Sequence, residues 1–246
     1  MHAMGSIWEY ANPRKFMGWT GHALPWLWAI GLGLCALGLV WGFFFTGDDF
    51  RMGSTVKIIY IHVPAALMAI NGYFLMFAAA LIWLIRRQPV SALVGRAAAP
   101  VGLVMTLIGL VTGAIWGQPM WGTWWAWDPR LTSFLILALF YLGYIALWEA
   151  ISDQDLAGDL TAMLAIVGSV FAVLSRYAAR FWNQGLHQGT SVPVVTGGRT
   201  IDDYFFWPLA ITMVGFFFLF VALVLVRART EVRARRLSVL QARQAI

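Results

Sequence analysis

The chain has 246 residues, of which 61% are hydrophobic and only 11% are charged. A water-soluble domain carries about 25% charged residues, so the composition excludes an ordinary soluble enzyme and indicates a protein that lies mostly in a membrane. The net charge of +6 does not indicate a nucleic-acid partner, because the basic residues near the C-terminus follow an apolar run. Such a segment typically binds anionic membrane lipid or a cytoplasmic protein.

Long apolar runs recur along the chain and predict its fold class. A run of about 20 residues lets an α-helix cross the hydrocarbon layer with its backbone hydrogen bonds satisfied. We therefore predict an all-α integral membrane bundle of six transmembrane helices, forming a single domain over residues 1–246. The predicted spans lie near 25–45, 58–85, 98–116, 131–150, 160–179 and 204–226.

The basic residues predict how the bundle is oriented. An even number of spans places both termini on the same side of the membrane. That side holds most of the Lys and Arg residues, namely Arg14, Lys15, Arg86, Arg87, Arg96 and the arginines from Arg227 onward. Because basic segments tend to stay in the cytoplasm, we expect cytoplasmic N- and C-termini, with segments 117–130 and 181–200 on the opposite side.

Several kinds of chemistry are missing from the sequence. No G-x-x-x-x-G-K-[ST] run is present, so any use of ATP would require a partner. Cys35 is the single cysteine, which excludes an internal disulfide, a thiolate metal cluster and a covalent haem link through C-x-x-C-H. No recognisable pair of general acid, base or nucleophile appears, and we expect a carrier rather than an enzyme.

The segment 116–130 is rich in tryptophan and is expected to be a loop between the third and fourth spans. Its tryptophans are Trp116, Trp121, Trp124, Trp125 and Trp127. An interfacial aromatic belt is one interpretation, but one or two indoles per helix end suffice for that. Adjacent indoles among Gly and Pro offer flat apolar faces with an N–H edge, which favours a platform for a large planar aromatic ligand.

Asp128 and Arg130 complete this segment. Asp128 stands between Trp127 and Pro129 at the edge of the fourth span. It is suited to cap that helix and equally suited to pair with Arg130, and both roles are compatible. The sequence leaves these alternatives open.

Two histidines flank the tryptophans on the same side of the predicted bundle. His62 stands at the start of the second span, and His187 lies between the fifth and sixth spans. His62 alone would be interpreted as a hydrogen-bonded interfacial residue. Together, two neutral imidazoles beside a tryptophan-lined surface match the axial ligands of a low-spin haem iron, with basic residues near the propionates. Zinc is disfavoured, since no Cys, Asp or Glu joins the pair at a usable spacing.

The stretch WGTWWAWDPRLT, from Trp121 to Thr132, resembles the tryptophan-rich WWD signature of the haem-handling proteins of cytochrome c maturation. With six spans, His62 before the signature and His187 after it, nearly the whole chain is similar to the haem exporter protein C family, CcmC. The haem lyases share the signature but have many more spans, and this chain is too short to be one.

The resemblance implies a site that holds haem b without a covalent bond, with His62 and His187 as the axial ligands. It implies that the porphyrin is held by Trp116, Trp121, Trp124, Trp125, Trp127 and Asp128. We add Arg130 of the same segment as a candidate cofactor-binding residue. The resemblance further implies a location in the bacterial inner membrane, with the site facing the periplasm, and delivery of haem to the chaperone CcmE. The implied partners in the complex are the ATPase CcmA and the subunits CcmB and CcmD.

Two other functions remain as alternatives. A membrane electron-transfer cytochrome of the b type also uses two histidines, but it usually places both on facing helices inside the bundle. A secondary transporter would need polar or ionisable groups near the membrane midplane. The spans offer only Asn71 as a clearly polar candidate, and we expect it to form an interhelical hydrogen bond.

The orientation is testable with reporter fusions. Reporters joined after Ile246 or within 86–96 should remain cytoplasmic, whereas reporters within 117–130 or 181–200 should be exported. Paired reporters, one active only outside the cytoplasm and one only inside it, would measure this. An exported C-terminus would contradict the proposed orientation.

Overall fold

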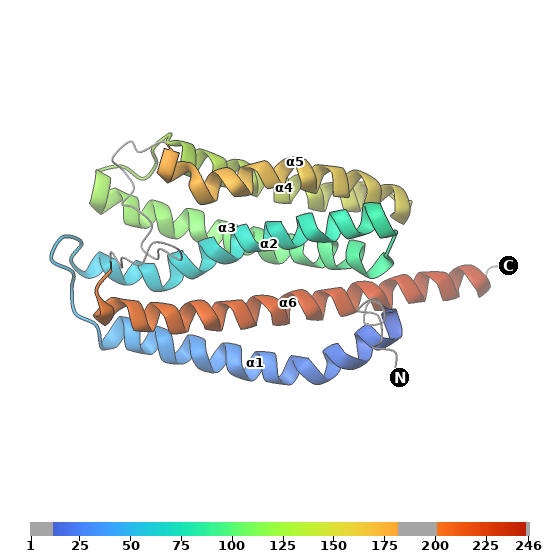
Figure 1. The fold of residues 1–246 in the computed structure, drawn as a ribbon, viewed down its shortest axis with the longest axis horizontal. Coiled ribbons are helices and arrows are strands. Elements are labelled where there is room, and N and C mark those ends of the chain that lie inside the picture. Colours follow the sequence, from blue (N-terminus) through green and yellow to red (C-terminus); the bar gives the residue numbers. More distant parts are fainter. Residues whose placement is uncertain (1–11, 182–200, 245–246) are drawn as a thin grey trace, which may run out of the picture.

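Six long helices make up most of the chain in the computed structural model, which describes residues 12–181 and 201–244 (Figure 1). They are α1 (Pro13–Phe44), α2 (Ile59–Arg86), α3 (Pro89–Trp121), α4 (Pro129–Ala150), α5 (Gln154–Phe181) and α6 (Asp203–Gln244); a short 3-10 helix, η2 (Ser54–Ile58), leads into α2. All six are long and apolar enough to cross a membrane. The predicted all-α membrane bundle is confirmed.

Three helices begin with the same local pattern, a polar capping residue followed by proline. The pairs are Asn12 with Pro13, Gln88 with Pro89, and Asp128 with Pro129. In each case the capping side chain accepts a hydrogen bond of 2.6–2.9 Å from a backbone N–H in the first turn. Proline suits the first helical position because its φ is already helical and its missing N–H would have no helical partner.

Four helices extend further than hydropathy predicts, because hydropathy marks only the apolar part of a helix. α1 begins at Pro13 rather than near 25, and α5 begins at Gln154 rather than near 160. α3 continues through Pro119 to Trp121, so the first part of the predicted loop 116–130 is helical. A proline removes only one backbone hydrogen bond, and the helix ends instead at Gly122, whose φ of 75° is left-handed. α6 continues to Gln244 rather than ending near 226, because the charged segment that follows the apolar run is rich in helix-forming Arg, Ala and Leu.

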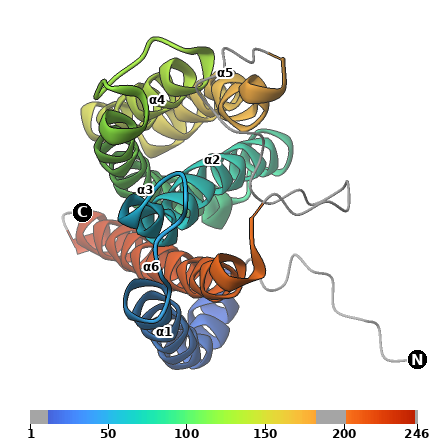
Figure 2. The ribbon, with the colours of Figure 1, turned by 90° about the vertical axis from the view of Figure 1, so that its left-hand side faces the viewer.

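The helices form three stacked pairs when the bundle is viewed from one end (Figure 2). α2 and α3 make the middle pair, and α4 and α5 pack on one side of it. α6 packs on the other side, and α1 contacts the rest of the bundle almost entirely through α6. The first residues of α1 and the last residues of α6 lie at the same end (Figure 1), as an even number of spans requires.

Small residues bring α1 and α6 into backbone contact. A Cβ on Gly38 would lie only 2.8 Å from the backbone nitrogen of Thr212, and a Cβ on Gly215 would lie 2.7 Å from that of Cys35. Lipid tails are as apolar as Leu, so helices in a membrane gain little from hydrophobic burial and depend on close packing. The glycines therefore allow the contact that attaches α1 to the bundle.

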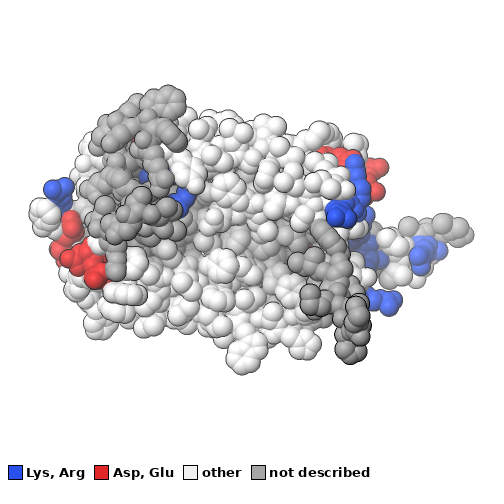
Figure 3. All heavy atoms as spheres, in the orientation of Figure 1, with Lys and Arg blue, Asp and Glu red and all other residues white. Residues whose placement is uncertain are grey.

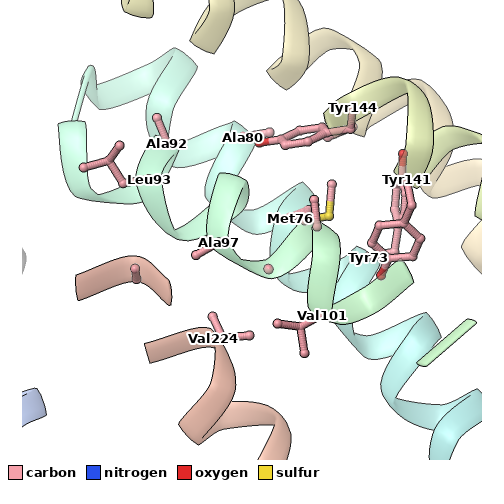
Figure 4. Packing of buried hydrophobic residues seen from close by; sticks show 14 of the residues in the cluster. Tyr73, Met76, Ala80, Ala92, Leu93, Ala97, Val101, Tyr141, Tyr144 and Val224 are labelled. Atoms are coloured by element: carbon pink, nitrogen blue, oxygen red, sulfur yellow. The ribbon is translucent and has the colours of Figure 1, made fainter. Parts of the chain in front are cut away.

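Tyr141 of α4 fills the middle of the bundle (Figure 4). It is fully buried, and its hydroxyl donates a 2.7 Å hydrogen bond to the Ala69 carbonyl of α2. Its ring meets that of Tyr73 edge-on, with centroids 5.0 Å apart. Met76 and Val101 continue this packing (Figure 4), so close-packed side chains occupy the membrane midplane between α2, α3 and α4.

Charged side chains gather at the two ends of the bundle, and the surface between them is uncharged in this view (Figure 3). We call the end with Arg86, Arg87, Arg96, Arg229 and Arg235 the basic end, and the opposite end, with segments 45–53 and 122–128, the tryptophan end. At the basic end, Arg96 of α3 pairs with Glu149 of α4 at 3.0 Å and with Glu231 of α6 at 3.2 Å. These pairs join three helices.

Part of the basic C-terminal segment is used within the bundle. The Arg229 guanidinium donates hydrogen bonds of 2.5 Å to the Met17 carbonyl and 2.7 Å to the Thr20 hydroxyl, which joins α6 to α1. The surface predicted to bind lipid or a partner is therefore smaller than the sequence indicates. Its exposed arginines are Arg227, Arg233, Arg236 and Arg243.

The interhelical hydrogen bond predicted for Asn71 is not formed among the described residues. The residue is exposed near the middle of α2, and its side chain forms no hydrogen bond within the described part of the chain. The expected interhelical bond is absent because Asn71 lies on the face of α2 that no other described helix covers.

The contact between α1 and α6 gives a stability prediction. Gly38→Ala should lower the free energy of unfolding by about 1–3 kcal/mol, the usual effect of overpacking, because its new Cβ meets backbone that cannot move aside. The matched control is Gly33→Ala in the same helix, where a Cβ meets nothing within 4 Å. Thermal unfolding in detergent would measure both variants. Equal melting temperatures would contradict the role assigned to Gly38.

Candidate functional site at the tryptophan end

His62 lies in the first turn of α2, because that helix begins at Ile59. The residue is half-buried, and its Nδ1 lies 3.1 Å from the Thr112 hydroxyl oxygen of α3. The imidazole is therefore positioned between two helices at the tryptophan end of the bundle.

The His62 ring packs against one face of α3. The rings of His62 and Trp116 meet at 63°, with centroids 5.8 Å apart. Between Thr112 and Trp116 stands Gly113, where a Cβ would lie 3.1 Å from His62 Cε1. Thr112 and Trp116 are one helical turn apart and share a face. The imidazole thus contacts three groups of a single helix: the Thr112 hydroxyl, the backbone at Gly113 and the Trp116 indole.

Gly113 belongs to a stripe of glycines on α3 at every fourth position. A Cβ on Gly109 would lie 3.0 Å from the Phe134 ring, and one on Gly117 would lie 3.0 Å from the Trp121 ring. Glycines at this spacing allow close approach along one helical face. The stripe makes room for two aromatic rings and the imidazole.

Trp116 is anchored in a small apolar cluster that also fixes the start of α2. The buried members of this cluster are Val56, Ile59, Tyr60, Phe205 and Leu209. The Trp116 Nε1–H is buried but has no hydrogen-bond acceptor in the described part of the chain. A buried donor without a partner is rare in native proteins, so this N–H is a candidate for contact with a ligand.

The loop from Gly122 to Asp128 holds the remaining tryptophans. The Thr123 hydroxyl donates a 2.9 Å hydrogen bond to the Trp125 carbonyl, and the Trp125 and Trp127 rings meet edge-on with centroids 5.5 Å apart. Nε1 of Trp125 is a second buried donor without an acceptor among the described residues. By contrast, Trp124 is 61% exposed and Trp127 is 75% exposed. The loop presents both open indole faces and an unsatisfied N–H.

Asp128 is the helix cap that the sequence left as one of two alternatives. Its carboxylate accepts a 2.6 Å hydrogen bond from the Leu131 N–H, and the residue is only 4% exposed. Arg130 lies within electrostatic range of the Asp128 carboxylate and of the Arg176 guanidinium of α5. The cap and the charge interaction with Arg130 therefore occur together.

The structure brings the predicted site residues together in part. It places the rings of His62 and Trp116 in contact, and likewise those of Trp125 and Trp127. It also places Arg130 within electrostatic range of Asp128. Trp121 lies against Gly117 of its own helix, and Trp124 is exposed. His187 lies outside the described residues.

Thr112 was missed from the sequence, although its position held a signal. It stands four residues before Trp116, which places both side chains on one face of the helix. The predicted span 98–116 contained both residues, but the sequence did not show that this face lies against His62.

A cavity at the basic end is a weaker candidate. It encloses about 260 Å³ and is lined by Trp83, Arg87, Pro89, Asp155 and Arg235. Its charges already have partners, because Arg235 pairs with Asp155 at 3.3 Å and Arg87 pairs with Asp159. An anionic ligand would have to displace these carboxylates.

Comparison with known proteins identifies similar chains. The model of the heme exporter protein C family, CcmC, matches residues 6–243. A protein named heme exporter protein C from Paracoccus denitrificans is 64% identical over 97% of this chain and 98% of its own length. One from Rhodobacter capsulatus is 63% identical over the same shares, and one from Escherichia coli K12 is 40% identical over 90% of this chain and 88% of its own.

The cap at Asp128 gives a second stability prediction. Asp128→Ala should destabilise the protein by about 1 kcal/mol, because the Leu131 N–H loses its acceptor. Asp128→Ser keeps a capping oxygen and should recover most of that loss. Melting temperatures in detergent would compare the two. An Ala variant as stable as the parent would show that the cap contributes nothing.

Proposed function

The chain belongs to the heme exporter protein C family, and from this membership we propose that it binds haem b at the tryptophan end and delivers it to the chaperone CcmE. It is a multi-pass membrane protein with a role in haem export for cytochrome c maturation. The haem is its cargo, held between two axial histidines and the tryptophan-rich segment.

The observation that carries the proposal is the position of His62. Its imidazole lies in the first turn of a helix, against Trp116, at the end of the bundle where the tryptophans gather. A neutral imidazole is the usual protein ligand of a haem iron. His187 is the proposed second ligand, as the family resemblance implies.

The other residues of the site fit the two kinds of surface that haem presents. The exposed faces of Trp124 and Trp127 suit stacking against a flat apolar macrocycle. The buried N–H groups of Trp116 and Trp125 lack acceptors among the described residues, and the carboxylate edge of a haem would supply oxygen atoms for them. Trp121, the last residue of α3, is the fifth tryptophan proposed to contact the porphyrin.

Arg130 is the proposed contact for a propionate. Within the described residues, its electrostatic partners are the Arg176 guanidinium and one acidic group, the Asp128 carboxylate. Two guanidinium groups beside one carboxylate leave a local excess of positive charge. Arginine binds carboxylates with two parallel hydrogen bonds, which would fix the haem edge.

The charge distribution supports a site that faces the periplasm of the bacterial inner membrane. The pairs and exposed arginines of the basic end lie opposite His62 along the bundle. Basic residues favour the cytoplasmic side, so the tryptophan end takes the outer position.

The proposed partners are the ATPase CcmA, the membrane subunit CcmB and the small subunit CcmD. The chain has no P-loop, so energy from ATP would come from another subunit. The position of Asn71 supports a partner subunit whose membrane helix packs against α2. The amide is exposed near the middle of α2, where a polar group on the partner's helix would give it a hydrogen bond. The exposed arginines from Arg227 to Arg243 suit anionic lipid or a cytoplasmic subunit.

The proposed role is that of a carrier, not of an enzyme. The acidic residue of the tryptophan-rich segment, Asp128, is engaged as a helix cap. Among the described residues around His62, the Thr112 hydroxyl lies 3.1 Å from the imidazole, but it is bonded to the Ile108 carbonyl and is not arranged as a nucleophile. This surface suits binding and orienting a planar ligand.

Substitution of the proposed ligands tests this function. His62→Ala and His187→Ala should each alter the visible spectrum of bound haem and stop cytochrome c maturation, and the double variant should lose haem more fully. Tryptophan stacking should retain some colour in the single variants. His22→Ala is the matched control, since that exposed histidine lies at the basic end, where its Nδ1 is 3.0 Å from the Gly18 carbonyl oxygen one turn away. A double variant with the parental low-spin spectrum would contradict the proposal.

A further inference from the structure

The hydroxyl of Thr112 is in contact with two kinds of group at once. Its oxygen lies 2.6 Å from the Ile108 carbonyl oxygen one turn earlier in α3, with a longer contact of 3.4 Å to the Gly109 carbonyl. It also lies 3.1 Å from Nδ1 of His62 on α2. A hydroxyl has one hydrogen to donate and lone pairs that accept, so the direction of each bond follows from its partner.

The carbonyl contact fixes the position of the hydroxyl hydrogen. A carbonyl oxygen carries no hydrogen, so a 2.6 Å separation between two oxygens requires the Thr112 hydrogen to lie between them. The same hydrogen cannot also point at His62. The 3.1 Å contact must then be donated by the imidazole, with Nδ1–H as the donor and the Thr112 oxygen as the acceptor.

We infer that Thr112 is a positioning residue that holds His62 with its hydrogen on Nδ1, so that the lone pair of the neutral ring is on Nε2. This inference rests on the proposed function, because Nε2 is then the nitrogen offered to the haem iron. Metal-binding histidines typically donate their other N–H to an oxygen acceptor, which fixes both tautomer and ring orientation.

The surroundings of Thr112 make it a rigid acceptor. Its side chain is β-branched and lies within a helix, where its bond to the Ile108 carbonyl selects one rotamer. Gly113 lets the imidazole approach α3, and Trp116 meets the ring edge-on from the next turn. The ring is held in orientation by these contacts before any ligand arrives.

The hydrogen bond should also tune the iron. Donation from Nδ1–H raises the basicity of Nε2, and a more basic axial ligand favours the oxidised iron. Removing the acceptor should therefore weaken haem binding and raise the midpoint potential. A merely structural role of Thr112 would change stability without moving the potential.

The tautomer can be measured without haem. The chain has 4 histidines, so nitrogen-15 spectra of histidine-labelled protein in detergent, at a pH where the rings are neutral, can be assigned with a His62→Gln variant. We expect the hydrogen on Nδ1 in the parent and in Thr112→Ser, and a mixture of tautomers in Thr112→Val, which has the same shape but no acceptor. A parent spectrum with the hydrogen on Nε2 would overturn the inference.

The haem-bound protein gives the second measurement. Thr112→Val should lower haem affinity by roughly 10- to 100-fold, the usual effect of losing such a partner, and shift the midpoint potential upward, whereas Thr112→Ser should stay close to the parent. The matched control is Thr106→Val, because Thr106 makes the same bond to a carbonyl one turn earlier, that of Gly102. If Thr112→Val does not fold, Thr112→Ala replaces it.

These outcomes separate the inference from the proposed function. Equal affinities and potentials in Thr112→Val and the parent would overturn the role of Thr112 while leaving haem binding intact. A parent that binds no haem would overturn the proposed function. In that case the nitrogen-15 spectra would still decide whether Thr112 holds the Nδ1–H tautomer.

Discussion

The packing of α2 against α3 is the contact on which both the bundle and the site depend. α4, α5 and α6 each pack on this central pair, and α1 reaches it through α6. At the tryptophan end the same contact places His62 of α2 beside Thr112 and Trp116 of α3. Because both sides of this arrangement come from membrane-spanning helices, its geometry is fixed by the fold rather than by a loop.

Glycine controls how close these helices come. In the middle of the bundle, a Cβ on Gly102 would collide with the side chain of Tyr141, whose hydroxyl donates a hydrogen bond to the Ala69 carbonyl. Near the end of the bundle, Gly113 gives the same close approach to the His62 imidazole. Along α3, therefore, one type of residue allows close packing in the middle of the bundle and the close approach of the imidazole at its end.

Hydropathy was sufficient to predict the number of spans, because a helix must cross the hydrocarbon with its own hydrogen bonds satisfied, and the even number correctly placed the start of α1 and the end of α6 at one end of the bundle. It could not predict that α3 continues to Trp121, since Pro119 is a helix breaker in isolation and is tolerated here near the helix end. Asp128 was recognised as a possible cap from its residue type and its position at the edge of the fourth span. The role of Thr112 could be recognised only from the tertiary structure, because it depends on a contact with His62, 50 positions away in the sequence.

The interior of the bundle argues against the electron-transfer and transporter alternatives. A resident haem between helices would need facing ligands and space near the midplane, but that region is filled by Tyr73, Met76 and Tyr141. Among the described histidines, His22 lies at the basic end and His62 lies at the tryptophan end, so they cannot share one iron. The polar candidate for transport, Asn71, is on the outside of α2. The rim of the bundle is therefore the better place for the proposed planar ligand, because His62 is already positioned there and the Trp124 and Trp127 rings are exposed. A ligand bound at the rim is also easier to pass on than one enclosed between helices.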